Sequence, residues 1–267
     1  MAEIVKIGTV LKTDEQGFLV SESSKDKIKS PWEEAVNEVV DQYLDKFADR
    51  IHSVYIKGSV SRGTAIQGVS DIDSLALIKG NNPIDTSWFR KAEQELKERF
   101  SFSTGFDFIV VPSDEVISGK KKVTAFLIKN LSACVYGQDL TLLLPKTKVG
   151  RDSAVSTWKF EFYIKDKIKL LNDEDDSKEI KRQCKWIMKR LLRTGFELVM
   201  VKNQSFTRDL YPCYEIFSKY YPEKEKEMKE VLELAINPTE NKSPILKILK
   251  TFGFWINGEI ENIFETP

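Results

Sequence analysis

Two carboxylates separated by a single residue, Asp71 and Asp73, are the first residues of this sequence whose spacing points to chemistry. They stand at the start of the apolar stretch 72–78, which predicts a strand, so both side chains point to one face of it. Beyond them that face becomes apolar, at Leu75 and Leu77. Two carboxylates this close repel one another, and one is driven toward protonation unless a cation lies between them. We therefore expect a hard divalent cation with oxygen ligands, typically Mg²⁺.

A glycine turn precedes the two acids. Gly58 and Ser59 follow a predicted strand at 53–56 and precede a short predicted helix at 61–66. Glycine lets a ligand approach the backbone closely, and the N–H groups of such a turn can face an anion. The Ser59 hydroxyl adds a further donor. These features predict a phosphate-binding turn.

A third acid, Asp107, interrupts the apolar stretch 106–111, which also predicts a strand. An ionised carboxylate in such a run is costly unless it is paired or bound to a metal. If this strand lies beside that of Asp71 and Asp73, three carboxylates converge at one edge of a sheet. The alternative is that Asp107 is a buried ion-pair partner of a nearby Arg or Lys.

These three elements together resemble the signature of the nucleotidyltransferase superfamily of DNA polymerase beta type. That signature is a hydrophobic residue, Gly, then Gly or Ser, a short spacer, and Asp-hydrophobic-Asp, with a third acid on a later strand. Here residues 56–59 lead to 71–73, and Asp107 supplies the third acid. The resemblance implies that Asp71, Asp73 and Asp107 are catalytic and bind metal, with a two-metal Mg²⁺ site. It also implies that Gly58, Ser59 and Ser70 bind the nucleotide.

The second half of the chain narrows the resemblance. Residues 191–198 and 205–210 look like the helical domain of aminoglycoside adenylyltransferases of the streptomycin/spectinomycin kind. Arg193 and Arg208 fall where those enzymes carry two basic residues that reach the ATP phosphates. The chain departs from them in two respects, since Asp107 stands where they carry a Glu that acts as base, and Arg208 replaces Lys.

The resemblance implies an enzyme that moves AMP from ATP to a hydroxyl of a small-molecule acceptor, plausibly an aminoglycoside-like antibiotic. The acceptor oxygen attacks the α-phosphorus in line and pyrophosphate leaves, its charge neutralised by metal, Arg193 and Arg208. Asp107 either binds a second metal or takes the proton of the acceptor. Two alternatives stay open: transfer of a nucleotide to RNA or protein, as in tRNA nucleotidyltransferases and antitoxin-type AMP transferases, or a catalytically silent nucleotide-binding protein. The intact acid triplet disfavours the second.

Composition excludes several other classes of protein. The 267 residues include 41 Lys and Arg against 41 Asp and Glu, and this zero net charge disfavours a large nucleic-acid footprint. Three cysteines without a CxxC pair, and a single histidine, argue against a thiolate or multi-histidine metal site. The sequence shows neither a secretory signal nor an apolar run of the ~18 residues that a membrane span needs. We therefore expect a soluble, cytoplasmic protein with no membrane partner.

The order of elements predicts two domains. Residues 1–147 alternate between helices and strands, which predicts an α/β (α+β) nucleotidyltransferase domain with a mixed sheet. Within it, residues 4–20 read as an extended arm or hairpin, and a capping box at Ser30 with Pro31 predicts a helix over 31–49. Residues 148–267 predict an all-α helical-bundle domain. Its predicted helices cover 156–171, 178–202, 208–220, 223–236 and 243–260.

Basic residues gather at 181–193 with no acid between them. On a helix, one face carries Arg182, Lys185, Lys189 and Arg193, and the opposite, packed face carries Ile180, Cys184, Ile187 and Leu191. The basic face is either a solvated helix surface, a positive wall of a nucleotide cleft, or a patch for an RNA or acidic partner. Arg62 likewise either contacts a phosphate or pairs with Asp71.

Overall fold

The structure is a computed structural model that describes residues 4–80 and 83–265. The chain forms two compact units. Residues 20–147 form one, called the sheet unit here, and residues 148–265 form most of the other, the helical unit. The chain passes from the sheet unit to the helical unit between residues 147 and 148, and residues 4–19 belong to the helical unit.

The N-terminal arm joins the helical unit through backbone hydrogen bonds. The Leu11 N–H donates to the Phe206 carbonyl at 2.7 Å, and the Thr9 N–H donates to the Asp209 carboxylate at 2.8 Å. The Thr207 hydroxyl in turn donates to the Thr9 carbonyl at 2.6 Å. An extended arm has no partners of its own for these backbone groups, so it finds them on another segment.

The sheet unit is built on four strands in the order β3-β2-β1-β4. The strands are β1 (Ile51–Lys57), β2 (Ile72–Ile78), β3 (Phe106–Pro112) and β4 (Ser132–Gly137). β1 runs antiparallel to β2 and β4, whereas β2 and β3 are parallel. The predicted mixed sheet is confirmed, and β4 is a strand that the sequence did not predict.

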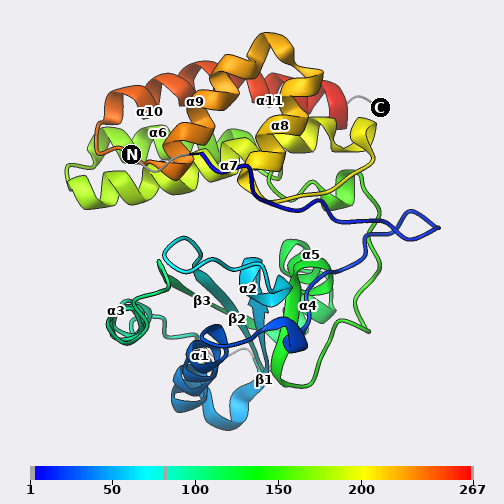
Figure 1. The fold of residues 1–267 in the computed structure, drawn as a ribbon, viewed down its shortest axis with the longest axis vertical. Helices are drawn as coiled ribbons and strands as arrows, with labels where there is room; N and C mark the ends of the chain where they lie inside the picture. Colours follow the sequence, from blue (N-terminus) through cyan, green and yellow to red (C-terminus); the bar gives the residue numbers. More distant parts are fainter. Residues whose placement is uncertain (1–3, 81–82, 266–267) are drawn as a thin grey trace. The chain divides into compact units, whose positions relative to one another are not determined.

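Helices cover both faces of this sheet (Figure 1). The helices of the unit are α1 (Trp32–Phe47), α2 (Ser59–Arg62), α3 (Phe89–Arg99), α4 (Ser113–Ile117) and α5 (Lys122–Leu131). One core contains residues of α1 and α3, and a second, on the opposite face, contains Val116 of α4 and Ile128 of α5. The bodies of the strands are therefore buried, and chemistry is confined to their ends.

The start of α1 differs from the prediction. No side chain caps the helix, so the predicted capping box at Ser30 is wrong. The N–H groups of Trp32 and Glu33 instead donate to the Lys29 carbonyl, at 2.9 and 3.2 Å. A backbone carbonyl thus accepts the hydrogen bonds at the start of the helix that a side chain was expected to accept.

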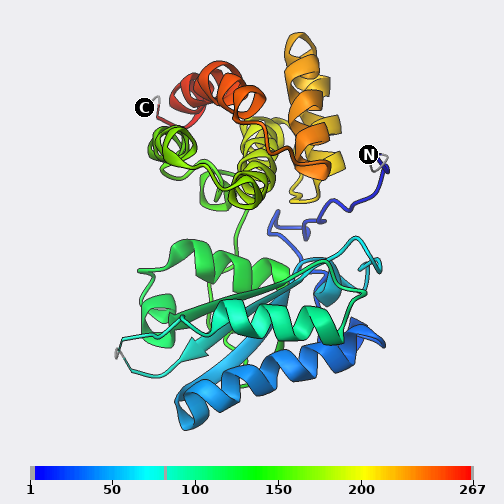
Figure 2. The same cartoon turned by 90° about the vertical axis from the view of Figure 1, so that its left-hand side faces the viewer.

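The helical unit is all-α apart from the arm (Figure 2). Its helices are α6 (Phe160–Asp173), α7 (Ser177–Asn203), α8 (Leu210–Tyr220), α9 (Glu225–Ile236), α10 (Lys242–Ile248) and α11 (Phe254–Ile260). It also has 3₁₀ turns at Arg151–Ser153 and Pro222–Lys224 and π-helical turns at Leu249–Gly253 and Glu261–Glu265. The sheet unit has 3₁₀ turns at Lys25–Lys27 and Ala48–Arg50. The predicted helical region after the sheet is confirmed.

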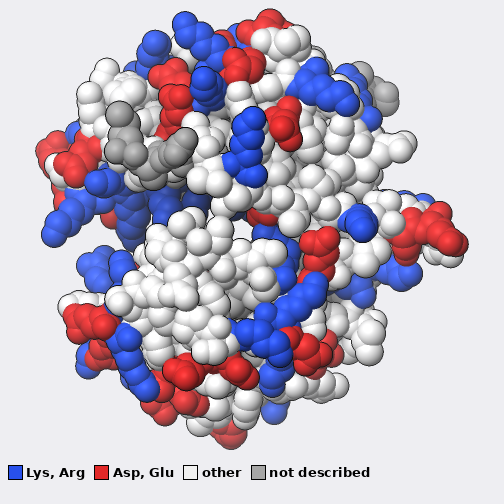
Figure 3. Space-filling model, viewed as in Figure 1, with Lys and Arg blue, Asp and Glu red and all other residues white. Residues whose placement is uncertain are grey.

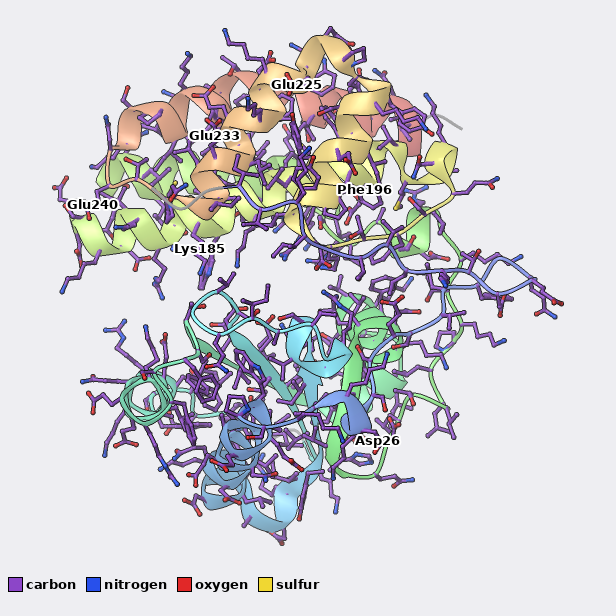
Figure 4. All side chains as sticks on the ribbon, in the orientation of Figure 1. Asp26, Lys185, Phe196, Glu225, Glu233 and Glu240 are labelled. Atoms are coloured by element: carbon purple, nitrogen blue, oxygen red, sulfur yellow. The ribbon has the colours of Figure 1, made fainter. Side chains whose placement is uncertain are left out.

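The two faces of α7 are as different as the sequence indicated. The predicted packed face, represented by Cys184 and Ile187, is fully buried, and Phe196 lies in the core against Phe206. Lys185 points away from the other helices (Figure 4), and Lys and Arg side chains gather along this part of the unit (Figure 3). In the described part of the chain, no helix combines the length and apolar character that crossing a membrane requires.

Candidate active site

Three neighbouring strands place charged residues at one register. Lys57, at the end of β1, is the pairing partner of Asp73 on β2, and Asp73 is the partner of Asp107 on β3. Because β2 and β3 are parallel and β1 is antiparallel to β2, the starts of the first two strands meet the end of the third at one edge. We call Lys57, Asp73 and Asp107 the charged row.

The charged row lies on the α4–α5 face of the sheet. Alternate residues of a strand share a face, and Tyr55, Leu75 and Val111 belong to the core on that side. The row is the continuation of this face beyond the edge of the core, as predicted for Asp73. Its two carboxylates remain accessible, since 30% of the Asp73 side chain is exposed and Asp107 is an exposed residue.

The carboxylates of this edge act strongly on one another. The pKa of Asp107 is raised to about 6, chiefly by loss of water around the group, then by the negative charges of Asp73 and Asp71. Lys57 opposes the shift, and its Nζ atom lies 3.3 Å from Asp73 Oδ1. The structure therefore brings together the three acids that the sequence singled out.

Asp71 and Ser70 lie in the turn that leads into β2. The Ile72 N–H donates to the Gly105 carbonyl at 2.9 Å, which joins the turn to the residues before β3. The Ser70 hydroxyl accepts a hydrogen bond from the Ile66 N–H at 3.0 Å. Ser70 thus holds the turn that positions Asp71, and its contact with a nucleotide stays a prediction.

Gly58 places the turn that was predicted to bind phosphate directly beside Asp73. Its φ of +77° and ψ of −145° form a conformation that residues with a side chain rarely adopt. A Cβ atom at this position would lie 3.5 Å from Asp73 Oδ2. Helix α2 begins at Ser59, earlier than predicted, and ends at Arg62. The first N–H groups of a helix have no partner within it, so this turn can present donors next to the acids.

A buried hydroxyl network fixes β3 against β2. The Tyr43 hydroxyl of α1 lies 2.8 Å from the Ser74 hydroxyl and accepts from the Ile109 N–H at 3.1 Å. The Ser74 hydroxyl donates to the Asp107 carbonyl at 2.7 Å. This network positions Asp107, and the sequence gave no sign of it because Tyr43 sits in an ordinary apolar stripe.

The residues present fit Mg²⁺ brought in with a phosphate better than a closed protein cage. Among the residues that the structure describes, no three His, Cys, Asp or Glu side chains are arranged to hold a metal ion. Mg²⁺ usually takes one or two carboxylates and completes its shell with substrate phosphates and water. Asp73 and Asp107 supply two such carboxylates, and a cation between them would relieve their repulsion. Asp71 as a further ligand stays a prediction.

The helical unit holds Arg193 and Arg208 close together in a polar network. Arg193 Nε donates to the Arg208 carbonyl at 3.1 Å, and Arg208 Nη1 donates to the Ser156 hydroxyl at 3.3 Å. Glu197, almost fully buried, accepts from the N–H groups of Ser156 and Thr157 at 2.8 and 2.9 Å. Burial raises the pKa of Glu197, while Arg208 and these hydrogen bonds oppose the shift. These contacts give both arginines a structural role, and their contact with a nucleotide stays a prediction.

Similarity of this chain to known proteins is found among solved structures. No protein-family model matches the chain, and neither does any curated protein. Among solved structures, the chain is similar to the spectinomycin adenyltransferase AAD(9) from Enterococcus faecialis, determined with ATP and spectinomycin. The two are 12% identical, the match covers 86% of this chain and 99% of the other, and the TM-score is 0.48. By its name, AAD(9) is an enzyme of the kind that the sequence motifs resemble.

Proposed function

We propose that this protein is a Mg²⁺-dependent nucleotidyltransferase that moves AMP from ATP to a hydroxyl of a small-molecule acceptor and releases pyrophosphate. The observation that carries the proposal is the alignment of Asp73 with Asp107 on adjacent strands, beside the turn at Gly58. Repelling carboxylates next to backbone donors suit a ligand that combines a divalent cation with phosphates.

Each part of this edge has a role in the proposed reaction. Asp73 would hold Mg²⁺, with Asp71 as a further ligand, and Gly58, Ser59 and Ser70 would bind phosphate oxygens. Bound Mg²⁺ would neutralise and orient the triphosphate. Phosphoryl chemistry needs little beyond positioning and charge stabilisation, so few other groups are required.

The acceptor hydroxyl forms a bond to the α-phosphorus as the bond to pyrophosphate breaks. Asp107, with its pKa raised to about 6, is mostly ionised at neutral pH and is therefore able to accept the hydroxyl proton. Its second possible role is to bind a second Mg²⁺. The contacts of Arg193 and Arg208 with the departing pyrophosphate rest on the motif resemblance alone.

The acceptor class also rests on the motif resemblance, which favours an aminoglycoside-like compound. The protein is incubated with Mg²⁺, ATP labelled at the α-phosphate, and a panel of spectinomycin, streptomycin, tRNA and protein acceptors. The proposal predicts label on a small molecule, and none with Asp73→Asn. Label on RNA or protein would overturn the acceptor class while keeping the chemistry. Binding of Mg²⁺ and ATP without turnover of any acceptor would instead make the chain a silent nucleotide-binding protein.

A further inference from the structure

Lys57 places its positive charge beside Asp73, at the position where a metal ion bound to that carboxylate is expected. Its Nζ atom lies 3.3 Å from Asp73 Oδ1, and only 16% of the side chain is exposed. The residue is fixed on both sides by strand pairing, with Asp73 on one neighbour and Ser132 on the other. It is also joined directly to Gly58, whose turn lies against the same carboxylate.

The geometry places Lys57 in competition with any metal on Asp73. An ammonium this close repels a divalent cation that approaches the same carboxylate. Divalent cations in water would therefore meet a site whose negative charge is already partly neutralised. The competition is weakest when the cation arrives with negative charge of its own.

A nucleoside triphosphate brings that negative charge. Its phosphates offset the repulsion between Lys57 and the metal, and they offer the displaced ammonium a new partner beside the Gly58 turn. A metal ion without nucleotide brings neither the offsetting negative charge nor a new partner for the ammonium. The same lysine thus opposes the metal alone and favours the metal together with nucleotide.

We infer that Lys57 is a resident counter-ion that keeps the charged row from binding free divalent cations and couples metal binding to the nucleotide. This inference rests on the proposed function. Nothing in the motif requires it, because Lys57 stands between the hydrophobic residue Ile56 and the glycine, where the signature has no lysine. It makes Lys57 a positioning residue that acts through Asp73.

The test is a titration of Mn²⁺, a spectroscopically visible substitute for Mg²⁺, into nucleotide-free protein, followed by electron paramagnetic resonance. Lys57→Met is expected to bind Mn²⁺ about tenfold or more tightly than the unaltered protein. Adding a non-hydrolysable ATP analogue should tighten Mn²⁺ binding strongly in the unaltered protein and much less in the variant. Lys57→Arg keeps the charge and should behave like the unaltered protein.

A matched control comes from the helical unit, where Lys242 pairs with Asp175 at 3.0 Å. Lys242→Met removes a more exposed Lys–Asp ion pair away from the charged row and should leave Mn²⁺ binding unchanged. If Lys57→Met does not fold, Lys57→Gln replaces it, because it keeps a polar side chain of similar length. Equal Mn²⁺ affinity in the unaltered protein and the neutral variant would overturn the inference and leave the proposed function standing. Absence of Mn²⁺ binding in every protein, with and without nucleotide, would overturn the proposed function as well.

Discussion

The two units each contain a cluster of ionisable groups. In one cluster the protein itself satisfies the charge, and in the other like charges still repel one another. In the helical unit, Glu197 is almost fully buried, but two backbone N–H groups and the charge of Arg208 satisfy it. In the sheet unit, Asp73 and Asp107 stay accessible and keep repelling one another in spite of Lys57. The first cluster is complete in the protein alone.

The difference separates a structural network from a site for a ligand. A buried charge that has its hydrogen bonds and counter-charge gains nothing from a further ion, and removing one member is costly. Carboxylates that repel one another gain from any cation that enters. The charged row is therefore where a ligand should change the energy of the protein, and the Glu197 network is where a mutation should.

The largest expected effect is on activity, from Asp73→Asn. Removing the carboxylate that we propose to bind Mg²⁺ should cost several kcal/mol of transition-state stabilisation, or about a thousandfold in rate. Pyrophosphate release measures the rate, and the melting temperature shows whether the protein still folds. Asp175→Asn, which removes an Asp from another ion pair with a lysine, is the control and should keep full activity.

In the Glu197 network, by contrast, the expected effect of Glu197→Ala is on stability. Leaving Arg208 and two buried N–H groups without this carboxylate should lower the free energy of unfolding by about 3–5 kcal/mol. Chemical denaturation measures the loss, and Glu197→Gln, which keeps one acceptor oxygen, should lose less. A loss below about 1 kcal/mol for the alanine variant would mean that the network is not the structural cluster described here.

Gly58→Ala should combine a modest stability loss with a larger loss of activity. A side chain at φ +77° should cost about 1–3 kcal/mol. Gly119 has the same φ of +77° with nothing within 4 Å of the added Cβ, so Gly119→Ala should cost as much stability and no activity. Equal activity losses in the two variants would remove the case for a phosphate-binding turn at Gly58.

The smallest effect is the pH dependence that Asp107 gives to stability. Its pKa in the folded protein, about 6, lies above its ordinary value of 3.8, so the folded protein binds this proton more tightly. The stabilising contribution is complete below pH 3.8 and is lost as the pH rises through 6. The free energy of unfolding of the unaltered protein, relative to Asp107→Asn, should therefore fall over this range. A difference that is flat, or that rises with pH, would contradict the raised pKa of Asp107.

The sequence predicted the parts of the site that are local in the chain. The pair at Asp71 and Asp73, the turn at Gly58 and the interrupted strand at Asp107 are all visible as patterns of neighbouring residues. The strand over 72–78 follows from an apolar run whose bounds coincide with β2. The buried apolar faces of α1 and α7 are likewise predicted by apolar residues at helical spacing.

The parts that the sequence missed depend on contacts between distant segments. Lys57 becomes part of the site only because strand register places it opposite Asp73. The arm joins the helical unit through bonds to Phe206 and Asp209, almost two hundred residues away. β4 was missed because it follows α5 directly, so no turn signal separates the two. Spacing alone carries no information on such pairings.

We expect the charged row to bind a cation and a nucleotide together. The most direct test is the free energy of unfolding of the protein with each ligand alone and with both. With Mg²⁺ and a non-hydrolysable ATP analogue at about one hundred times the dissociation constant, the free energy of unfolding should rise by about 2.7 kcal/mol. The analogue with a chelator in place of Mg²⁺ should give little of this gain, and Asp73→Asn should give none with both ligands. Equal stabilisation in the absence of Mg²⁺, or in the variant, would contradict the account.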